Sequence, residues 1–414
     1  MAMKILLFGE FQDCTEHSQR PSPFCNASPA TLHYELSIPF CMESSMRRVL
    51  RFVPLLMLLH LSGFAFGEQK CHTRLGTHKV AIKVADESFD FVMRPGELEI
   101  FIDGKSFAIY VWSDPRTTRP YFKQVKALRA DVQLTRNHPP QEGDFDDHET
   151  FHPGIWWGFG DVGGHDYWRM KAKIIGGQFV EEPAATTDSV SFAVRNRLLT
   201  SAGNEIFCEQ ICRYQIMRRS FGILMICEST FLRTQDDFWL GDQEEMGLAF
   251  RVATPLTTEK DGQICDSEGR TNLKQIRTRQ SDWCNYSGPV EGSYGGLMLM
   301  NDPKNFRRPW WHAVSTGLLV ANPLGESELT GNGKRKQNVL VKKDKPFRLL
   351  YGCLVHLHDE EQQFDPEAAY ADFLELLAEI DERNTAAAGR MPVLPKEDLP
   401  KVPDRFSVSV FAGE

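Results

Sequence analysis

The stretch "LEIFIDGKSFAIYVW", residues 98–112, decides the fold class of this chain. Apolar residues alternate with others on both sides of Asp103-Gly104, with Leu98, Ile100 and Ile102 on one face before it and Phe107, Ile109 and Val111 on one face after it. A period of two is typical of a strand with one buried face. An Asp-Gly pair between two such runs predicts a β-hairpin, because both central residues of the tight turn need a positive φ.

The same alternation continues through most of the chain. It is clearest in residues 188–217, where Ser201 to Asn204 supplies a turn, and it recurs in residues 220–234, 246–254, 295–302, 316–325 and 345–359. Many short strands with almost no helices between them predict an all-β fold. We expect a large antiparallel β-sandwich.

One helix is expected at the end of this domain, in "DPEAAYADFLELLAEIDERN", residues 365–384. Asp365 suits the N-cap position and Pro366 the first helical position. The apolar residues then fall on one stripe, which predicts packing against a sheet; they are Tyr370, Phe373, Leu374, Leu377 and Ile380.

The chain is expected to contain one folded domain with segments on either side. From Met46 the sequence "MRRVLRFVPLLMLLHLSGFAFGEQ" has a basic start, an apolar run and small residues, as a secretory signal does. We therefore expect an upstream extension at 1–45, a signal peptide at 46–67, a sandwich domain at 68–384 and a tail at 385–414. Export to the periplasm or medium follows, with an uncleaved anchor as the alternative and no other membrane contact.

Composition limits the kind of partner. The 414 residues include 47 basic and 56 acidic ones, for a net charge of −9, and there is no long basic run, so nucleic acid is not an expected partner. Cysteines are scattered through strand-like runs, which favours core residues, with one or two disulfide bridges as the alternative. The oligomeric state cannot be deduced.

The segment "DDHETFHPGIWWGFGDVGGHDYW", residues 146–168, gathers the most site-like chemistry. Its Gly158-x-Gly160-x-x-Gly163 matches a dinucleotide fingerprint, but no helix is expected to follow, so a nucleotide site is disfavoured. His148 and His152 have the spacing of two metal ligands on a helix. Prolines on both sides argue against a helix here, so no cofactor is predicted, and a metal ion bound by His148, His152 and His312 stays an alternative.

A carbohydrate cleft accounts for more of these residues. Aromatic rings stack on the apolar face of a sugar, while carboxylates, imidazoles and a guanidinium bind its hydroxyl groups. We expect acid or base roles for His148, His152, Glu245 and His312. The expected ligand contacts are Trp156, Trp157, Asp161, Asp166, Trp168, Arg251, Trp283, Tyr286 and Trp310.

Five ordered motifs resemble an exported bacterial family labelled PmoA-type, or "methane oxygenase". They are "RPYFKQVKALRADVQLTRNHPP", "DDHETFHPGIWWGFGDVGGHDYW", "GDQEEMGLAFRVA", "WCNYSGP" and "PWWHAVSTGLLVANPLG", between residues 119 and 325. This chain has Pro153 where that family usually has an arginine. The resemblance implies, by analogy of fold, a β-supersandwich like that of galactose mutarotases, which use a histidine acid and a glutamate base.

Three functions therefore remain open. The first is an exported protein that binds or converts a carbohydrate with a His/Glu/Trp cleft. The second is a metal-dependent oxidoreductase at the same histidines, as the family label implies. The third is a binding module without catalysis.

Overall fold

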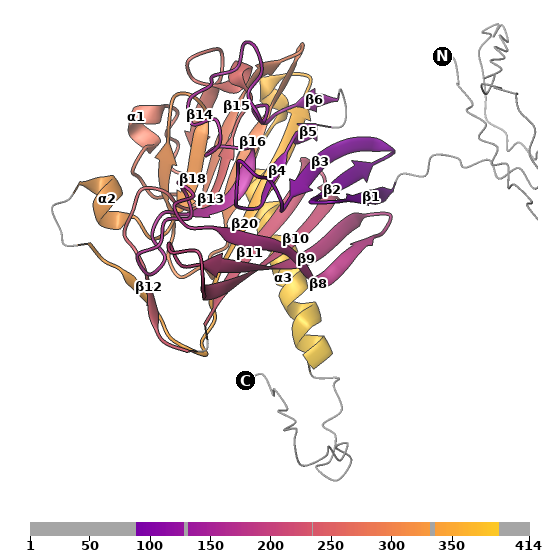
Figure 1. Ribbon diagram of the computed structural model, residues 1–414. Coiled ribbons are helices and arrows are strands. Elements are labelled where there is room, and N and C mark those ends of the chain that lie inside the picture. Colours follow the sequence, from indigo (N-terminus) through magenta and orange to yellow (C-terminus); the bar gives the residue numbers. More distant parts are fainter. Residues whose placement is uncertain (1–87, 128–130, 234, 332–335, 389–414) are drawn as a thin grey trace, which may run out of the picture. The chain divides into compact units, whose positions relative to one another are not determined.

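The computed structural model describes residues 88–127, 131–233, 235–331 and 336–388, which form two large antiparallel sheets (Figure 1). The first sheet has eight strands in the order β1-β2-β3-β4-β7-β13-β18-β17. These strands are β1 (Phe89–Arg94), β2 (Glu97–Ile102), β3 (Lys105–Val111), β4 (Tyr121–Lys123), β7 (Ile155–Phe159), β13 (Met246–Arg251), β17 (Trp310–Ala313) and β18 (Leu318–Asn322).

The second sheet also has eight strands, in the order β14-β15-β16-β20-β11-β10-β9-β8. They are β8 (Ile174–Ala185), β9 (Ser189–Leu199), β10 (Ile206–Arg219), β11 (Gly222–Leu232), β14 (Gln263–Asp266), β15 (Trp283–Val290), β16 (Ser293–Asn301) and β20 (Phe347–His358). Two small sheets pair β5 (Lys126–Ala127) with β6 (Val132–Gln133) and β12 (Phe238–Leu240) with β19 (Val339–Val341). The short helices are α1 (Leu273–Ile276), α2 (Glu326–Thr330) and the 3-10 turns η1 (Thr254–Leu256) and η2 (Glu361–Gln363).

The two large sheets pack face to face around one core. Tyr110 of the first sheet meets Phe192 and Tyr214 of the second, with ring centroids 5.1 and 5.3 Å apart. Inward-facing residues of both sheets form one buried hydrophobic cluster. This confirms the predicted antiparallel β-sandwich.

The expected hairpin is present, with one correction. Asp103 and Gly104 have φ of 53° and 73° and join β2 to β3, as the Asp-Gly pair predicted. The register of β2 and β3 shifts between Ile100 and Phe101, however, because β3 carries one extra residue there, Phe107. Phe107 therefore points into the core between the sheets, while Ile109 and Val111 face the other side of the first sheet.

The long helix α3 (Pro366–Ala388) is the expected C-terminal helix. Asp365 accepts a hydrogen bond from the backbone N–H of Ala368, which confirms it as the N-cap. Phe373 and Leu376 of α3 are buried against the face of the second sheet that points away from the core. The helix continues past residue 384, where the sequence had placed the start of a tail.

The described residues leave several expectations unexamined. The predicted extension, the signal segment and residues 389–414 lie outside them. Every described cysteine is free, so none of the bridges considered from the sequence forms among them: Cys208, Cys212, Cys227, Cys265, Cys284 and Cys353. Cys208 and Cys212 point into the core from β10, as the core interpretation predicted.

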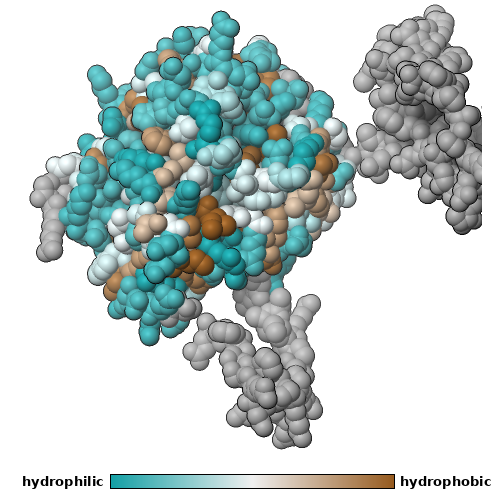
Figure 2. Space-filling view, viewed as in Figure 1, coloured by the Kyte–Doolittle hydropathy of each residue, from teal (hydrophilic) through white to brown (hydrophobic). Residues whose placement is uncertain are grey.

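No helix in the described residues is long and apolar enough to span a membrane. The face in Figure 2 is mainly hydrophilic, with small hydrophobic groups.

Candidate functional site

Strand β7 carries adjacent tryptophans that point to opposite sides of the first sheet. Trp157 points into the core, where its ring stacks near Phe159. Trp156 points to the outer face, which we define as the side of the first sheet away from the second sheet. Successive residues of a strand alternate between faces, so only one of the two can belong to a site on the outer face.

Strand register places His312 on the same outer face. His312 pairs with Val320, Val320 with Ala249, and Ala249 with Trp156, so these four residues form one row across β17, β18, β13 and β7. The row crosses three strand spacings of about 4.8 Å each, which puts the backbones of His312 and Trp156 roughly 14 Å apart. His312 and Trp156 therefore lie at opposite ends of one row on the outer face.

Two loops cover the Trp156 end, and buried arginines hold them. The guanidinium of Arg136 donates to the backbone carbonyls of Phe145 (2.8 Å), Asp147 (2.7 Å) and His152 (2.9 Å). These bonds close the loop of residues 136–152 on itself. Arg119 donates to the carbonyl of Phe151 in this loop and, at 2.5 Å, to the carbonyl of Trp168 in the loop after β7.

Four aromatic rings pack together between these loops and the sheet, and three of them stack. The ring of His148 lies 4.7 Å from that of His152 at 13°, and His152 lies 5.5 Å from Trp156 at 15°. Trp168 meets Trp156 edge-on at 5.4 Å. His148 has a positive φ of 53°, and the backbone N–H of His152 bonds its carbonyl, so the two histidines share a single turn. Trp156 and Trp168 are only 1% and 0% exposed, so they cannot be the open stacking floor that the sequence predicted.

Buried Arg251 and His152 form a hydrogen-bonded group with the half-buried Asp147. Arg251 donates to both carboxylate oxygens of Asp147, at 2.6 and 3.1 Å, and its Nη1 lies 3.2 Å from Nδ1 of His152. Burial would raise the pKa of Asp147, but the bonds and charge of Arg251 outweigh it and lower the pKa to about 2. Burial and then the charge of Arg251 hold the pKa of His152 well below its usual value, so His152 is neutral at pH 7.

Glu245 lies just before β13 and pairs with Arg169, which also reaches Asp166 at 3.4 Å. Burial raises the pKa of Glu245, while the charge of Arg169 opposes the change. A partly buried carboxyl group with a raised pKa is suited to proton transfer near neutral pH.

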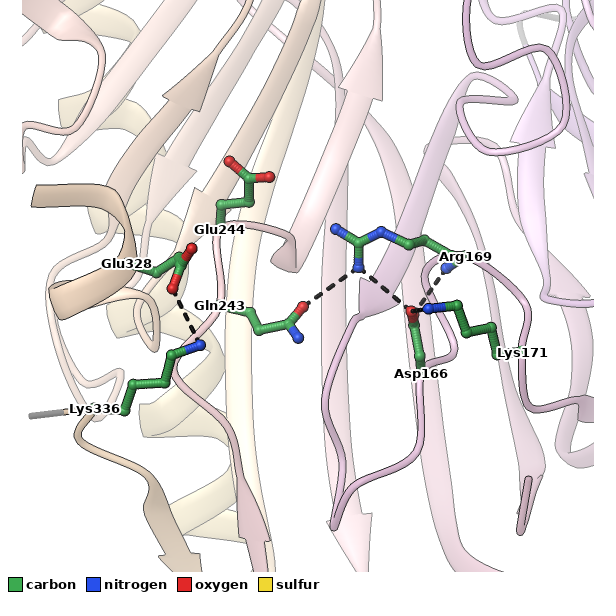
Figure 3. Close-up of a pocket in the computed structure, with 7 residues that line it drawn as sticks. All are labelled: Asp166, Arg169, Lys171, Gln243, Glu244, Glu328 and Lys336. Atoms are coloured by element: carbon green, nitrogen blue, oxygen red, sulfur yellow. Dashed lines mark hydrogen bonds and ion pairs between the residues drawn. The ribbon is translucent and has the colours of Figure 1, made fainter. Parts of the chain in front are cut away.

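A polar cavity of about 250 Å³ opens next to this ion pair (Figure 3). Its lining is entirely polar or charged: Asp166, Arg169, Lys171, Gln243, Glu244, Glu328 and Lys336. Buried Asp242 supports the cavity from behind, because its carboxylate accepts the backbone N–H groups of Ser327, Glu328 and Gln337. These bonds join the segment before β13 to α2 and to the residues before β19.

His312 lies on the other side of Glu244. Its Nδ1 is 4.0 Å from a carboxylate oxygen of Glu244, and no hydrogen-bond partner contacts that nitrogen. Burial, with the charges of Arg277 and Arg169, lowers the pKa of His312 to about 4. His152 and His312 are therefore both neutral at pH 7, and neither is the imidazolium ion that a histidine acid would need.

The structure brings together only some of the residues expected from the sequence. His148, His152, Trp156, Trp168 and Arg251 are in contact, as the rings and bonds above show. Asp166 and Glu245 meet through Arg169. His312 and Trp310 lie on the same face, at the β17 edge.

Four expected ligand contacts lie elsewhere. Trp157 is in the core between the sheets, for the reason given above. Trp283 is buried in the cluster beneath α3, and Tyr286 is a core residue whose hydroxyl donates to the carbonyl of Val314 at 3.1 Å. Asp161 closes a turn by accepting the N–H of Gly164 at 2.8 Å. These residues are aromatic or acidic for structural reasons.

Sequence reasoning missed three arginines of the site. Arg119 and Arg136 bind backbone carbonyls of distant segments, and Arg169 joins two carboxylates. Arg119 and Arg136 lie in the first of the quoted motifs, which was the only signal for them. A hydrogen bond to a backbone carbonyl can be made to any residue type, so it produces no pattern that can be recognised in the sequence.

A metal ion does not fit the histidine cluster. Asp147, His148 and His152 each place one ligand atom within 4.8 Å of the others. The guanidinium of Arg251 already donates to both oxygens of Asp147 and to Nδ1 of His152, and a second cation would be repelled there. His312, the expected third ligand, is at the far end of the row.

Comparison with known proteins gives a family but no activity. The model of a family of unknown function (DUF6807) matches residues 97–369. Two solved structures are similar: a galactose mutarotase related enzyme from Lactobacillus acidophilus (8% identity, TM-score 0.32, 65% of this chain and 97% of that chain) and a galactose mutarotase-like protein from Lactobacillus casei (9% identity, TM-score 0.29, 65% and 100%). No curated protein matches the sequence. None of these matches has the methane-oxygenase label.

Proposed function

Because the chain belongs to a family of unknown function (DUF6807), its activity has to be inferred from its own side chains, and we propose that it binds a small carbohydrate in the cavity beside β13 and acts on it there. The observation that carries the proposal is the lining of that cavity. Three acidic groups, three basic groups and one amide surround it, with no apolar side chain among them. The acids and bases of the lining pair with one another, as Arg169 and Lys171 do with Asp166 and Lys336 does with Glu328. A polyhydroxylated ligand can join these pairs as donor and acceptor, whereas an apolar ligand would shield them from water and offer no hydrogen bond.

The size of the cavity favours one sugar unit. Pockets for drug-sized ligands span roughly 300–1,000 Å³, and this cavity of about 250 Å³ lies just below that range. It takes its side chains from the loop after β7, the segment before β13, α2 and the segment before β19 (Figure 3). The ligand would thus be held at one end of the outer face.

Glu245 is the group that we assign to proton transfer on this ligand. It lies behind Arg169, which reaches both Glu245 and the cavity. Its raised pKa suits an acid or base, whereas His312 and His152 stay neutral and can only hydrogen-bond. The histidine cluster lends no support to metal chemistry, so the oxidoreductase alternative is not proposed.

The test is binding of a sugar panel by the full chain. Glucose, galactose, N-acetylglucosamine and glucuronate would be titrated by calorimetry, with anomeric and product signals followed by proton NMR. We expect at least one to bind, and Glu244→Gln to weaken it at least tenfold, about 1.4 kcal/mol for one charged hydrogen bond.

Glu268→Gln is the matched control, because Glu268 is 46% exposed and Glu244 is 43% exposed, and Glu268 pairs with Arg308 away from the cavity. Its affinity should equal that of the unmodified chain. Equal affinities for all three proteins would contradict the cavity as the site. Turnover that persists in Glu245→Gln would contradict the role given to Glu245.

A further inference from the structure

Arg251 is a buried charged residue on the outer face, and it contacts a buried histidine. It is 1% exposed and lies at the end of β13, in the row of residues next to that of Trp156. Both of its terminal nitrogens bond Asp147, and one also reaches His152. We propose that Arg251 is a positioning residue that fixes His152 in the Nε2–H tautomer and so prepares that N–H for an acceptor atom of a bound ligand.

The tautomer follows from the chemistry of the two partners. A guanidinium carries only donors, so the atom that faces it must be an acceptor. Nδ1 of His152 lies 3.2 Å from Nη1 of Arg251, and it must therefore be the unprotonated nitrogen. In a neutral imidazole the hydrogen then sits on Nε2.

Burial, and then the surrounding charges, keep His152 from gaining a second proton. Arg251, Arg119 and Arg136 all act on its ring from the strand and the loops, together with His148 stacked above it. The one close carboxylate, Asp147, is engaged by both terminal nitrogens of Arg251. His152 thus differs from a free histidine, which changes charge near neutral pH.

The hydrogen on Nε2 has no acceptor among the residues that the structure describes. His152 is 3% exposed, and its Nε2 is buried without a hydrogen-bond partner. The indole nitrogens of Trp156 and Trp168, on rings within 6 Å of His152, are also buried and unpartnered. Because unpaired buried donors cost about 1–3 kcal/mol each, an acceptor supplied by a ligand would be favourable here.

The ring of His148 stacks on that of His152, and the side chain of His148 is 53% exposed. A ligand atom that displaced this ring would reach His152. This part of the proposal rests on the proposed function, because it takes the ligand to be the sugar of the neighbouring cavity. A ring oxygen or carboxylate oxygen of that sugar would be the acceptor.

The experiment measures the tautomer directly in the full chain. Histidine is labelled with ¹⁵N, and multiple-bond ¹H–¹⁵N spectra are recorded from pH 7.5 to 5.5, with His152→Gln to identify the signals. We expect the pattern of a neutral Nε2–H ring that does not change over this range. An Nδ1–H ring or a charged ring would overturn the proposal.

Arg251→Lys keeps the charge but cannot bond Asp147 through two nitrogens and also reach His152, so the ring should populate both tautomers. Asp147→Asn serves as a second variant if the first does not fold, with the same expected mixture. Arg219→Lys is the control, because Arg219 of β10 makes an equally bidentate pair with Asp372 of α3, away from the site. The His152 signals of this variant should not change. An unaltered tautomer in both test variants would refute the positioning role.

Sugar affinity of the same variants separates the two proposals. We expect a tenfold or greater loss in Arg251→Lys and none in Arg219→Lys. If the tautomer changes while the sugar affinity does not, the Nε2–H group does not hydrogen-bond the ligand. The proposed role of His152 in binding then fails, whereas the proposal that the cavity binds the sugar is unaffected. If the unmodified chain binds no sugar, the proposed function fails, and the tautomer result is still read from the spectra.

Discussion

At the scale of single residues, Gly158 explains how Trp168 reaches the sheet. A Cβ atom at this position would lie 2.4 Å from Cε3 of Trp168 and 2.9 Å from Nε1 of Trp156. Real side chains do not approach so closely, so the indole of Trp168 occupies the space that a side chain would need. Gly158, which matches part of a dinucleotide fingerprint, thus allows the Trp168 ring to pack against β7.

This close approach gives a direct prediction for Gly158→Ala. We expect a loss of about 1–3 kcal/mol in unfolding free energy, typical of an overpacked core, together with weaker sugar binding. Urea unfolding followed by circular dichroism measures the first effect.

A double-mutant cycle tests the cause. Trp168→Leu removes the ring that the new methyl would meet, so the pair Gly158→Ala and Trp168→Leu should lose less stability than the sum of the single variants. Strict additivity would show that the methyl group is harmful for another reason.

At the scale of elements, α3 begins at a cap that the sequence already indicated. The carboxylate of Asp365 satisfies one of the N–H groups that the first turn leaves unpaired. Asp365→Ala should therefore lower the unfolding free energy by about 1 kcal/mol, as measured by thermal unfolding. Glu375→Ala, at an exposed position of the same helix, should change it by less than about 0.5 kcal/mol. Equal losses would mean that the cap contributes nothing.

Local pattern predicted elements well and their faces less well. The Asp-Gly turn, the period of two and the helix stripe are local signals, and each led to the correct element. The bulge between β2 and β3 turns Ile109 and Val111 to the opposite face of the sheet from the one expected. No residue type in the sequence predicted this bulge. The alternation that separates Trp156 from Trp157 was available in the sequence and would have removed Trp157 from the expected site.

At the scale of the whole molecule, buried neutral histidines make stability depend on pH. Burial lowers the pKa of His138 and of His312 to about 4, and His152 and His356 are also lowered. The unfolded chain then binds more protons than the folded one below about pH 6.5, so stability must fall as pH drops from there toward 4. For His312 alone the loss at pH 5 is about 2 kcal/mol, while the raised pKa of Glu245 acts in the opposite direction.

Urea unfolding at pH 7.5 and 5.0 measures this effect. The full chain should be less stable at pH 5.0, and His312→Asn should show a smaller difference between the two values. Equal stability of the unmodified chain at both values would contradict the buried neutral state of these histidines.

The candidate site was harder to predict than the fold because it is assembled from distant segments. His312 and Trp156 share a row only because four strands pair in one register, and that register is set by the whole sheet. The cavity needs Glu328 of α2 and Lys336 of the segment before β19, which lie far along the chain from Asp166. The residue types in the sequence pointed to His152, Glu245 and Arg251 as site residues. They did not show which side chains these residues contact.

The bonds from Arg136 to the loop of residues 136–152 have a consequence for related sequences. This one side chain binds carbonyls from Phe145 to His152, so the loop is a ring closed without a covalent link. The entropy of closing a flexible ring grows slowly, by about 0.6 kcal/mol for each doubling of length. Relatives could therefore gain or lose residues around Gly143 at little cost, whereas a change at Arg136 would open the ring. Sequences of this family should be aligned on that arginine, and gaps are expected between it and Asp147.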